Sequence, residues 1–130
     1  MTSLKHFDLV IADFGSNNGT SEQSGIRPAV VLQNTAQNAA SPTTIIAPIT
    51  SVLKKTHMSS HIVLGRRFGL YKESMVLLEQ IKTINQSSII KTIGHINDES
   101  VIASINQGIL KTLGIPENAY NTSTTEEAAI

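Results

Sequence analysis

The segment Ser21-Glu22-Gln23-Ser24-Gly25-Ile26-Arg27-Pro28 leads a polar, glycine-containing stretch directly into the apolar run Pro28–Gln33. The polar residues and Gly25 predict a loop, and the β-branched and apolar residues after them predict a strand. Pro28 biases Arg27 towards extended backbone, so the guanidinium leaves the chain where the strand begins. An arginine fixed in this way suits bidentate binding of a phosphate or carboxylate, although a solvent-exposed arginine beside a turn is the plainer interpretation.

Further short strands flank this junction. The predicted strands are Phe7–Phe14, Pro28–Gln33, Thr43–Thr50, His61–Leu64 and Ser74–Ile84. Polar connections are predicted at Gly15–Ile26 and Asn34–Pro42, and a mobile loop at Ser51–Ser60, which shows no clear period. Several short strands at this spacing favour a small sheet curled on itself or a barrel.

Helix signals gather near the C-terminus. Asn97 is a suitable N-cap, and Asp98 and Glu99 suit the positive end of the helix dipole. An apolar stripe at helical spacing follows, formed by Ile102, Ile105, Ile109 and Leu113. Gly114 stands where a C′ glycine ends a helix. A shorter helix is predicted at Gln86–Ile93.

Length and composition exclude several classes of protein. The 130 residues suit one domain, expected to span residues 1–116, with a polar tail at 117–130. The absence of cysteine excludes disulfides, thiolate metal sites and a cysteine nucleophile. Aromatic residues make up only 4%, which argues against a broad base-stacking surface. No apolar run approaches 18 residues, so we expect no membrane association and a cytoplasmic location.

The net charge of zero conceals an asymmetry along the chain. Residues 1–92 carry nine Lys and Arg against five Asp and Glu, whereas residues 93–130 carry one against five. Such a chain can present a basic face to a polyanion, although unevenly distributed surface charge explains the same counts.

Other polar residues stand in positions that suit a functional site. Thr50 and Ser51 place two hydroxyl groups where a strand opens into a loop. Glu79 and Gln80 interrupt an apolar strand, and the Glu79 carboxylate must therefore either face solvent or have a partner. His57 and His61 have the i, i+4 spacing of metal ligands on a helix, but no third ligand accompanies them and no metal is expected.

Five segments together resemble the MazF/PemK family of type II toxin–antitoxin ribonucleases, over about Phe7 to Gly114. They are Ser21–Pro28, Ala29–Asn34, Ser41–Thr43, Ala47–Ser51 and Ser74–Ile84. The resemblance implies a mostly β (α+β) fold, an SH3-like, partly open β-barrel of the PemK/CcdB type with a packed C-terminal helix, assembled as a homodimer. It also implies a sequence-specific endoribonuclease that needs neither metal nor cofactor and is neutralised by a cognate antitoxin protein.

The reaction that the resemblance implies is cleavage of single-stranded mRNA by attack of the 2′-OH, leaving 2′,3′-cyclic phosphate and 5′-OH ends. Two alternatives remain open. A non-catalytic toxin of the same fold would inhibit DNA gyrase by protein–protein contact, and a degenerate relative would bind RNA or antitoxin without cutting.

Roles for individual residues follow from the matching positions. Arg27 and Thr50 match the catalytic pair of the family, and a proton-transfer group is sought among Glu22, Glu79 and His61. The expected RNA-binding residues are Ser21, Gln23, Ser51, Lys54, Lys55, Arg66, Arg67 and Gln80. The four cations among them are expected to follow the RNA backbone.

The sequence departs from the family pattern near its start. The usual Arg/Lys-Gly-Asp reads Lys5-His6-Phe7-Asp8, so a phenylalanine replaces the glycine. At Leu77, some relatives have a second arginine near the site, and this chain lacks it. We therefore expect no mechanism that uses a second arginine there.

Overall fold

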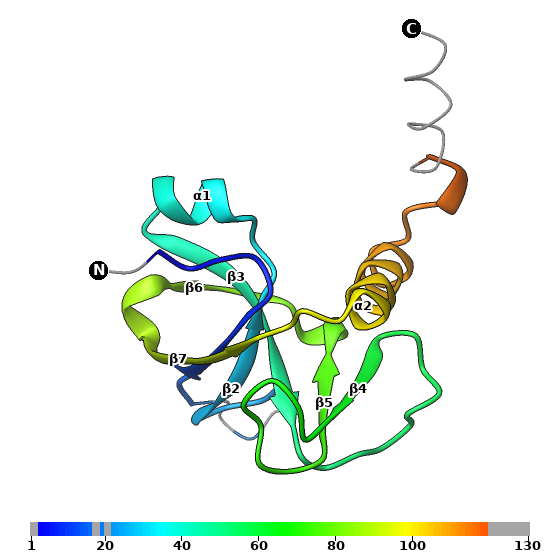
Figure 1. The fold of residues 1–130 in the computed structure, drawn as a ribbon, viewed down its shortest axis with the longest axis horizontal. Helices are drawn as coiled ribbons and strands as arrows, with labels where there is room; N and C mark the ends of the chain where they lie inside the picture. The colour runs from blue at the N-terminus through cyan, green and yellow to red at the C-terminus, as the bar shows by residue number, and fades with distance from the viewer. Residues whose placement is uncertain (1–2, 17–18, 20–21, 120–130) are drawn as a thin grey trace, which may run out of the picture.

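The computed structural model describes residues 3–16, 19 and 22–119. Within these residues, seven strands, two helices and two 3₁₀ turns follow the order β1 Asp8–Asp13, β2 Ile26–Val31, α1 Thr35–Ala40, β3 Thr43–Thr50, β4 His61–Gly65, β5 Ser74–Leu77, η1 Leu78–Gln80, β6 Lys82–Asn85, η2 Gln86–Ser88, β7 Ile89–His95 and α2 Glu99–Thr112. The strands form one antiparallel sheet in the order β4-β5-β3-β2-β1-β7, and β6 also pairs with β3. Figure 1 shows this partly open, curled sheet with α2 packed beside β4 and β5. The predicted fold class is confirmed.

Strand β3 is the centre of the sheet, because three strands pair with it. On one edge β2 pairs with residues 46–48, and on the other edge β6 pairs with 43–46 and β5 with 49–50. Between β5 and β6 the register shifts by three residues, which are the three residues of η1. The prediction of one strand over Ser74–Ile84 is therefore wrong, and the interruption turns Glu79 and Gln80 out of the sheet.

Two other predictions of local structure are wrong. The segment Asn34–Pro42 contains helix α1, where the Asn34 side chain accepts a hydrogen bond from the Gln37 backbone N–H and so caps the helix. The segment predicted as a helix at Gln86–Ile93 instead holds the short turn η2 and most of strand β7. Pairing with β1 overrides the weak local helix signal there.

Helix α2 confirms the predicted C-terminal helix with two corrections. Asp98, rather than Asn97, is the N-cap and accepts hydrogen bonds from two backbone N–H groups. The buried stripe runs through Val101, Ile105 and Gly108, whereas Leu113 is 61% exposed. A Cβ at Gly108 would lie 2.5 Å from Leu78 Cδ1, so the missing side chain lets the helix pack directly on η1.

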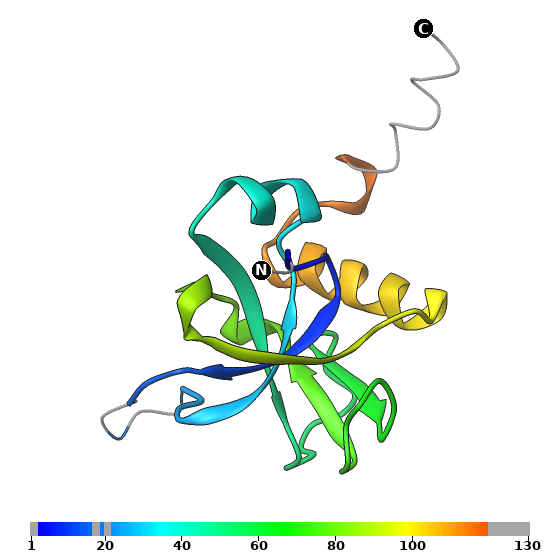
Figure 2. The ribbon, with the colours of Figure 1, turned by 60° about the vertical axis from the view of Figure 1, so that its left-hand side comes forward.

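The sheet has a core on each face. The larger core joins β3, β4 and β5 to α2, through Ile49, Leu64, Val76, Leu78 and Ile105 among others. The second core lies among β1, β2, β3 and β6, and consists of Leu4, Val10, Ala12, Phe14, Ala29, Val31, Ile46 and Ile84. Figure 2 shows the joined ends of β1 and β2 (blue) reaching away from the body of the molecule.

Phe7, which replaces the family's glycine, adopts a left-handed backbone with φ of 72°. Such a conformation suits glycine and costs another residue roughly 1 kcal/mol. The phenylalanine ring compensates, because it is buried in the larger core and stacks on His6 at a centroid distance of 3.7 Å. The departure is therefore tolerated by the fold.

The connection from β4 to β5 is fixed against β7. A side chain at Gly69 would overlap the carbonyl of Ile93, and one at Gly94 would overlap the carbonyl of Phe68. Arg67 adds an ion pair, since its Nη1 lies 2.8 Å from Asp98 Oδ2 at the start of α2. This loop, residues 66–73, is thus anchored at its middle. Within the described part of the chain, no helix is long and apolar enough to cross a membrane.

Candidate active site

Arg27 and Thr50 lie opposite each other at the open ends of β2 and β3. The register pairs Ala29 with Pro48, and continuing it by two residues brings Arg27 opposite Thr50. Residues directly opposite on antiparallel strands direct their side chains to the same face. Both side chains line one cavity, which brings together the two residues that the family resemblance pairs.

Local hydrogen bonds orient both side chains and leave donors free. Arg27 donates from Nε to the carbonyl oxygen of Ser24 at 2.8 Å, which fixes the guanidinium plane. The Thr50 hydroxyl oxygen accepts from the Val52 backbone N–H at 3.0 Å. Among the residues that the structure describes, neither the Arg27 Nη groups nor the Thr50 hydroxyl hydrogen has an acceptor. These donors are available to an anionic oxygen placed between them.

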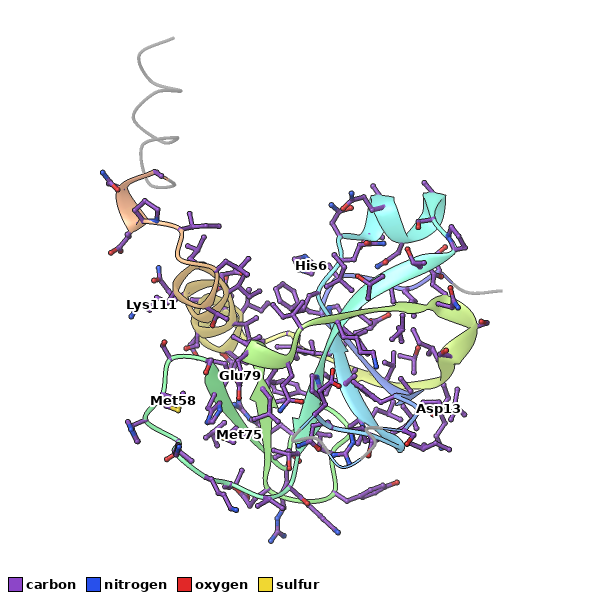
Figure 3. The ribbon with its side chains drawn as sticks, turned by 180° about the vertical axis from the view of Figure 1, so that it is seen from behind. His6, Asp13, Met58, Met75, Glu79 and Lys111 are labelled. Atoms are coloured by element: carbon purple, nitrogen blue, oxygen red, sulfur yellow. The ribbon has the colours of Figure 1, made fainter. Side chains whose placement is uncertain are left out.

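The cavity that they share, here called the main groove, has a volume of about 740 Å³. Its lining residues are Gln23, Arg27, Thr50, Ser51, Val52, Lys54, Lys55, His61, Met75, Leu77, Glu79 and Gln80. Three permanent cations stand against one carboxylate in this set, which favours a polyanionic ligand. In Figure 3, Glu79 and Met75 lie together, whereas Met58 lies further out on the loop before β4.

His61 connects the loop after β3 to η1. Its Nδ1 lies 3.0 Å from the Lys54 carbonyl oxygen and 3.1 Å from that of Lys55, and its Nε2 lies 2.9 Å from Glu79 Oε2. Carbonyl oxygens only accept, so Nδ1 carries a hydrogen, and a carboxylate at Nε2 favours a second one. The ring is therefore held as an imidazolium. Its side chain is only 8% exposed, whereas that of Glu79 is 40% exposed.

The pair perturbs both pKa values in opposite directions. Burial lowers the pKa of His61, but the hydrogen bonds to Glu79 and to the Lys54 carbonyl outweigh it and raise that pKa above its ordinary value. Burial raises the pKa of Glu79, yet the hydrogen bond from His61 leads the effects that bring it below its ordinary value. The pairing thus favours the protonated form of His61 and the ionised form of Glu79.

The glycine-containing loop before β2 is attached to η1. The Gln23 backbone N–H donates to Gln80 Oε1 at 2.8 Å, which joins two residues predicted to contact RNA. Glu22 is exposed and borders a smaller adjoining cavity that also involves Glu79 and Gln80. The predicted contact at Ser21 lies outside the described residues.

The structure does not bring every predicted residue into the main groove. Arg66 is paired with Glu73 at 3.6 Å, and Arg67 with Asp98, and neither arginine lines the groove. Their assignment to RNA remains a prediction. Sequence reasoning missed Val52, Met75 and Leu77 as lining residues, since apolar residues in strands and loops carry no chemical signal of a site. In the described ranges, no group of three or more His, Cys, Asp or Glu residues could hold a metal ion.

Comparisons with known proteins agree with the resemblance. Residues 5–113 match the model of the family described as PemK-like, MazF-like toxin of type II toxin-antitoxin system. The chain is 39% identical over 97 residues to Endoribonuclease EndoA of Bacillus subtilis (strain 168), covering 74% of this chain and 83% of that protein. It is 34% identical over 113 residues to Endoribonuclease MazF of Staphylococcus saprophyticus, covering 86% and 92% of the two chains.

A solved structure resembles the fold. The endoribonuclease in complex with its cognate antitoxin from Mycobacterial species superposes with a TM-score of 0.73 at 17% identity. The match covers 88% of this chain and 98% of that one. At this identity the likeness concerns the fold alone, and it extends over nearly the whole described chain.

Proposed function

The chain belongs to the PemK-like, MazF-like toxins of type II toxin–antitoxin systems, and from that membership we propose that it is an endoribonuclease that cuts single-stranded RNA in the main groove. The observation that carries this proposal is the pair of Arg27 and Thr50, facing each other with open donors in a cationic groove. The gyrase alternative is not supported, because the relatives described above are named as endoribonucleases.

The proposed reaction uses the RNA's own 2′-hydroxyl as the nucleophile. Its oxygen attacks the adjacent phosphorus, the bond from phosphorus to the 5′ oxygen breaks, and a 2′,3′-cyclic phosphate and a 5′-OH result. Negative charge builds on the phosphoryl oxygens in the transition state. Arg27 stabilises that charge through its Nη donors and Thr50 through its hydroxyl, both oriented before the RNA arrives.

We assign the base to Glu79. Its carboxylate is half-exposed towards the groove and ionised near neutral pH, whereas His61 is nearly buried with both ring nitrogens engaged. Glu79 accepts the 2′-hydroxyl proton, and His61 acts as a positioning residue that orients this carboxylate. The departing 5′ oxygen takes its proton from Arg27 or from water in the open groove.

The remaining groove residues bind and align the strand. Lys54 and Lys55 contact backbone phosphates, so affinity falls with rising salt. Ser51, Gln23 and Gln80 provide hydroxyl and amide groups that read base edges on single-stranded RNA. We propose, as the family implies, that a cognate antitoxin neutralises the enzyme, that the enzyme acts as a homodimer, and that it works in the cytoplasm.

The test is cleavage of a short single-stranded RNA library in the presence of EDTA. Wild type should cut at one word and leave a cyclic phosphate, identified by the mass of the product. Arg27→Ala should reduce the rate at least about 1,000-fold and Thr50→Ala at least about 100-fold. Lys111→Ala, a charge change on the outer part of α2 (Figure 3), is the matched control and should cut normally.

A second substrate tests the nucleophile. A single 2′-deoxy nucleotide at the cleaved position should abolish cutting while binding persists. Cutting that survives this replacement would overturn the mechanism. If the folded, antitoxin-free protein binds the library without cutting it, it is a degenerate relative. If it neither binds nor cuts the library, gyrase becomes the next target to test.

A further inference from the structure

A second cavity of about 280 Å³ adjoins the catalytic pair and has no assigned role. It shares Arg27, Thr50 and Ser51 with the main groove, but its other walls differ. Ser74 borders the second cavity and Met75 the main groove. Because successive residues of a strand point to opposite faces, the two cavities lie on opposite faces of β5 and meet at Arg27 and Thr50.

The second cavity has an apolar floor and a polar rim. Pro28, Ile49 and Leu70 supply apolar surface, and Lys72 supplies a cation beside them. Tyr71 stands at its rim and is 95% exposed. This cavity, here called the Tyr71 pocket, therefore suits a ligand with a flat apolar face and a nearby negative charge.

The exposure of Tyr71 does not come from an unattached loop. Leu70, the preceding residue, is buried in the larger core, and its backbone N–H donates to the Arg67 carbonyl at 3.1 Å. Gly69 lies directly against the backbone of β7. An exposed tyrosine ring on an anchored backbone is typical of a binding position, since a tyrosine usually buries much of its ring.

We propose that the Tyr71 pocket binds the nucleobase of one nucleotide flanking the scissile phosphate, with the base stacked on the Tyr71 ring. This rests on the proposed function, because the phosphate between Arg27 and Thr50 fixes where the neighbouring nucleotides begin. Every base offers a π-face to an aromatic side chain, and the Lys72 cation in the lining would attract a neighbouring phosphate. RNA is favoured as the occupant because the pocket is continuous with the cationic main groove.

The proposal gives the two cavities different tasks. The main groove carries the charged groups that act on the phosphate, and the Tyr71 pocket sets the position of one base. One tyrosine is enough for one base, whereas the low aromatic content of the chain still argues against a platform for several bases. Tyr71 is thus a binding residue whose loss weakens affinity and leaves the chemical step intact.

The experiment uses the RNA word found in the cleavage test, made uncleavable by one 2′-deoxy nucleotide. 2-Aminopurine replaces the base on either side of the scissile phosphate in turn, and fluorescence reports stacking. Wild type and Tyr71→Phe should quench one of the two positions, and Tyr71→Ala should not. On the cleavable RNA, Tyr71→Ala should raise KM about tenfold with kcat within about twofold. Ile90→Ala, an exposed apolar residue on β7 outside both cavities, is the control.

Three results would overturn the proposal. One is equal quenching by Tyr71→Ala and wild type, and another is a fall in kcat without a change in KM. The third is a change in sedimentation of Tyr71→Ala, which would make the pocket a contact between copies of the protein. If wild type does not cleave RNA at all, the proposed function itself fails, so the two failures are distinguishable.

Discussion

The two sides of the proposed catalytic pair, Arg27 and Thr50, are built by different means. On one side the polar wall, formed by Lys54, Lys55, His61 and Glu79, is held by hydrogen bonds around one imidazole ring. On the other side the apolar wall, formed by Pro28, Ile49 and Leu70 with Tyr71 beside them, is held by close packing of the Gly69 backbone against β7. The stability of the polar wall therefore depends on pH, whereas that of the apolar wall depends on the volume of the residues at positions 69 and 94. Under the two proposals above, the polar wall serves the chemistry and the apolar wall serves base recognition.

The largest effect is expected from the polar wall. Glu79→Gln keeps the size of the side chain and an oxygen that accepts from His61, but it removes the proposed base. We expect kcat to fall about 100- to 1,000-fold with little change in KM, measured by single-turnover cleavage. Glu73→Gln, which removes a carboxylate from the β4–β5 loop, should cut at the wild-type rate. If Glu22→Gln instead causes the large loss, the base belongs to the loop before β2.

Substitutions that disturb the close packing of the apolar wall should lower the stability of the protein. A methyl group at Gly94 would overlap the carbonyl of Phe68, so Gly94→Ala should lower the free energy of unfolding by about 3 kcal/mol or more. Urea denaturation measures this change. Gly114→Ala is the control, since no atom lies within 4 Å there and only its left-handed backbone is strained, at about 1 kcal/mol. Equal losses at both positions would show that the loop does not depend on this close approach.

These two walls also differ in how far the sequence could predict them. Arg27 and Thr50 each stand where an apolar strand meets a polar loop, but it was the resemblance to the family that singled them out as a pair. Strand pairing then explains why two residues 23 positions apart line one cavity. The polar pair Glu79 and Gln80 marked the interruption at η1, but the three-residue shift between two strands on one edge of β3 depends on pairing with that strand and could not be predicted. Gly69 and Gly94 resemble ordinary turn and strand glycines until the crossing of two distant segments is seen.

Burial patterns were harder to predict than positions of elements. The predicted helix stripe was right at Ile105, and Ile102 and Ile109 pack partly buried against the core, but Leu113 is exposed. Val101 and Gly108, where the helix contacts η1 closely, complete the buried face instead. The pairing of His61 with Glu79 spans 18 positions in sequence and depends on the turn at η1. Tyr71 gave no signal, because only the anchored loop makes its exposure informative.

The pH dependence of stability is the next effect in size, and it concerns His61 and Glu79 of the polar wall. The raised pKa of His61 means that its contribution to stability is full below about pH 6.5 and lost as pH rises through the folded value. The lowered pKa of Glu79 means that its contribution is present above about pH 4.5 and lost as pH falls. The pair is therefore most stabilising between these values.

Activity should follow the same two groups. As pH increases, we expect kcat to rise while Glu79 loses its proton, at values below 4.5, and to fall again while His61 loses its proton, at values above 6.5. His61→Gln should lower kcat about tenfold at pH 6 and remove the alkaline fall, while quenching by Tyr71 is unchanged. An alkaline fall that persists in this variant would place its cause elsewhere and would separate His61 from the orientation of Glu79.

The smallest effect concerns the ion pair that joins the apolar wall to α2. Hydrogen bonds from Ser100 and then from Arg67 lower the pKa of Asp98 to about 2, from a usual 3.8. Its contribution to stability is therefore present above about pH 4 and lost as pH falls towards 2.

Asp98→Asn keeps a good N-cap but loses the ion pair with Arg67, so Tm should drop by only a few degrees at pH 7. Glu99→Gln, in the same helical turn, should change Tm less. Because the pair is exposed, the difference should shrink in high salt and vanish near pH 2, and a difference that persists there would mean that Asp98 acts through helix capping rather than through Arg67.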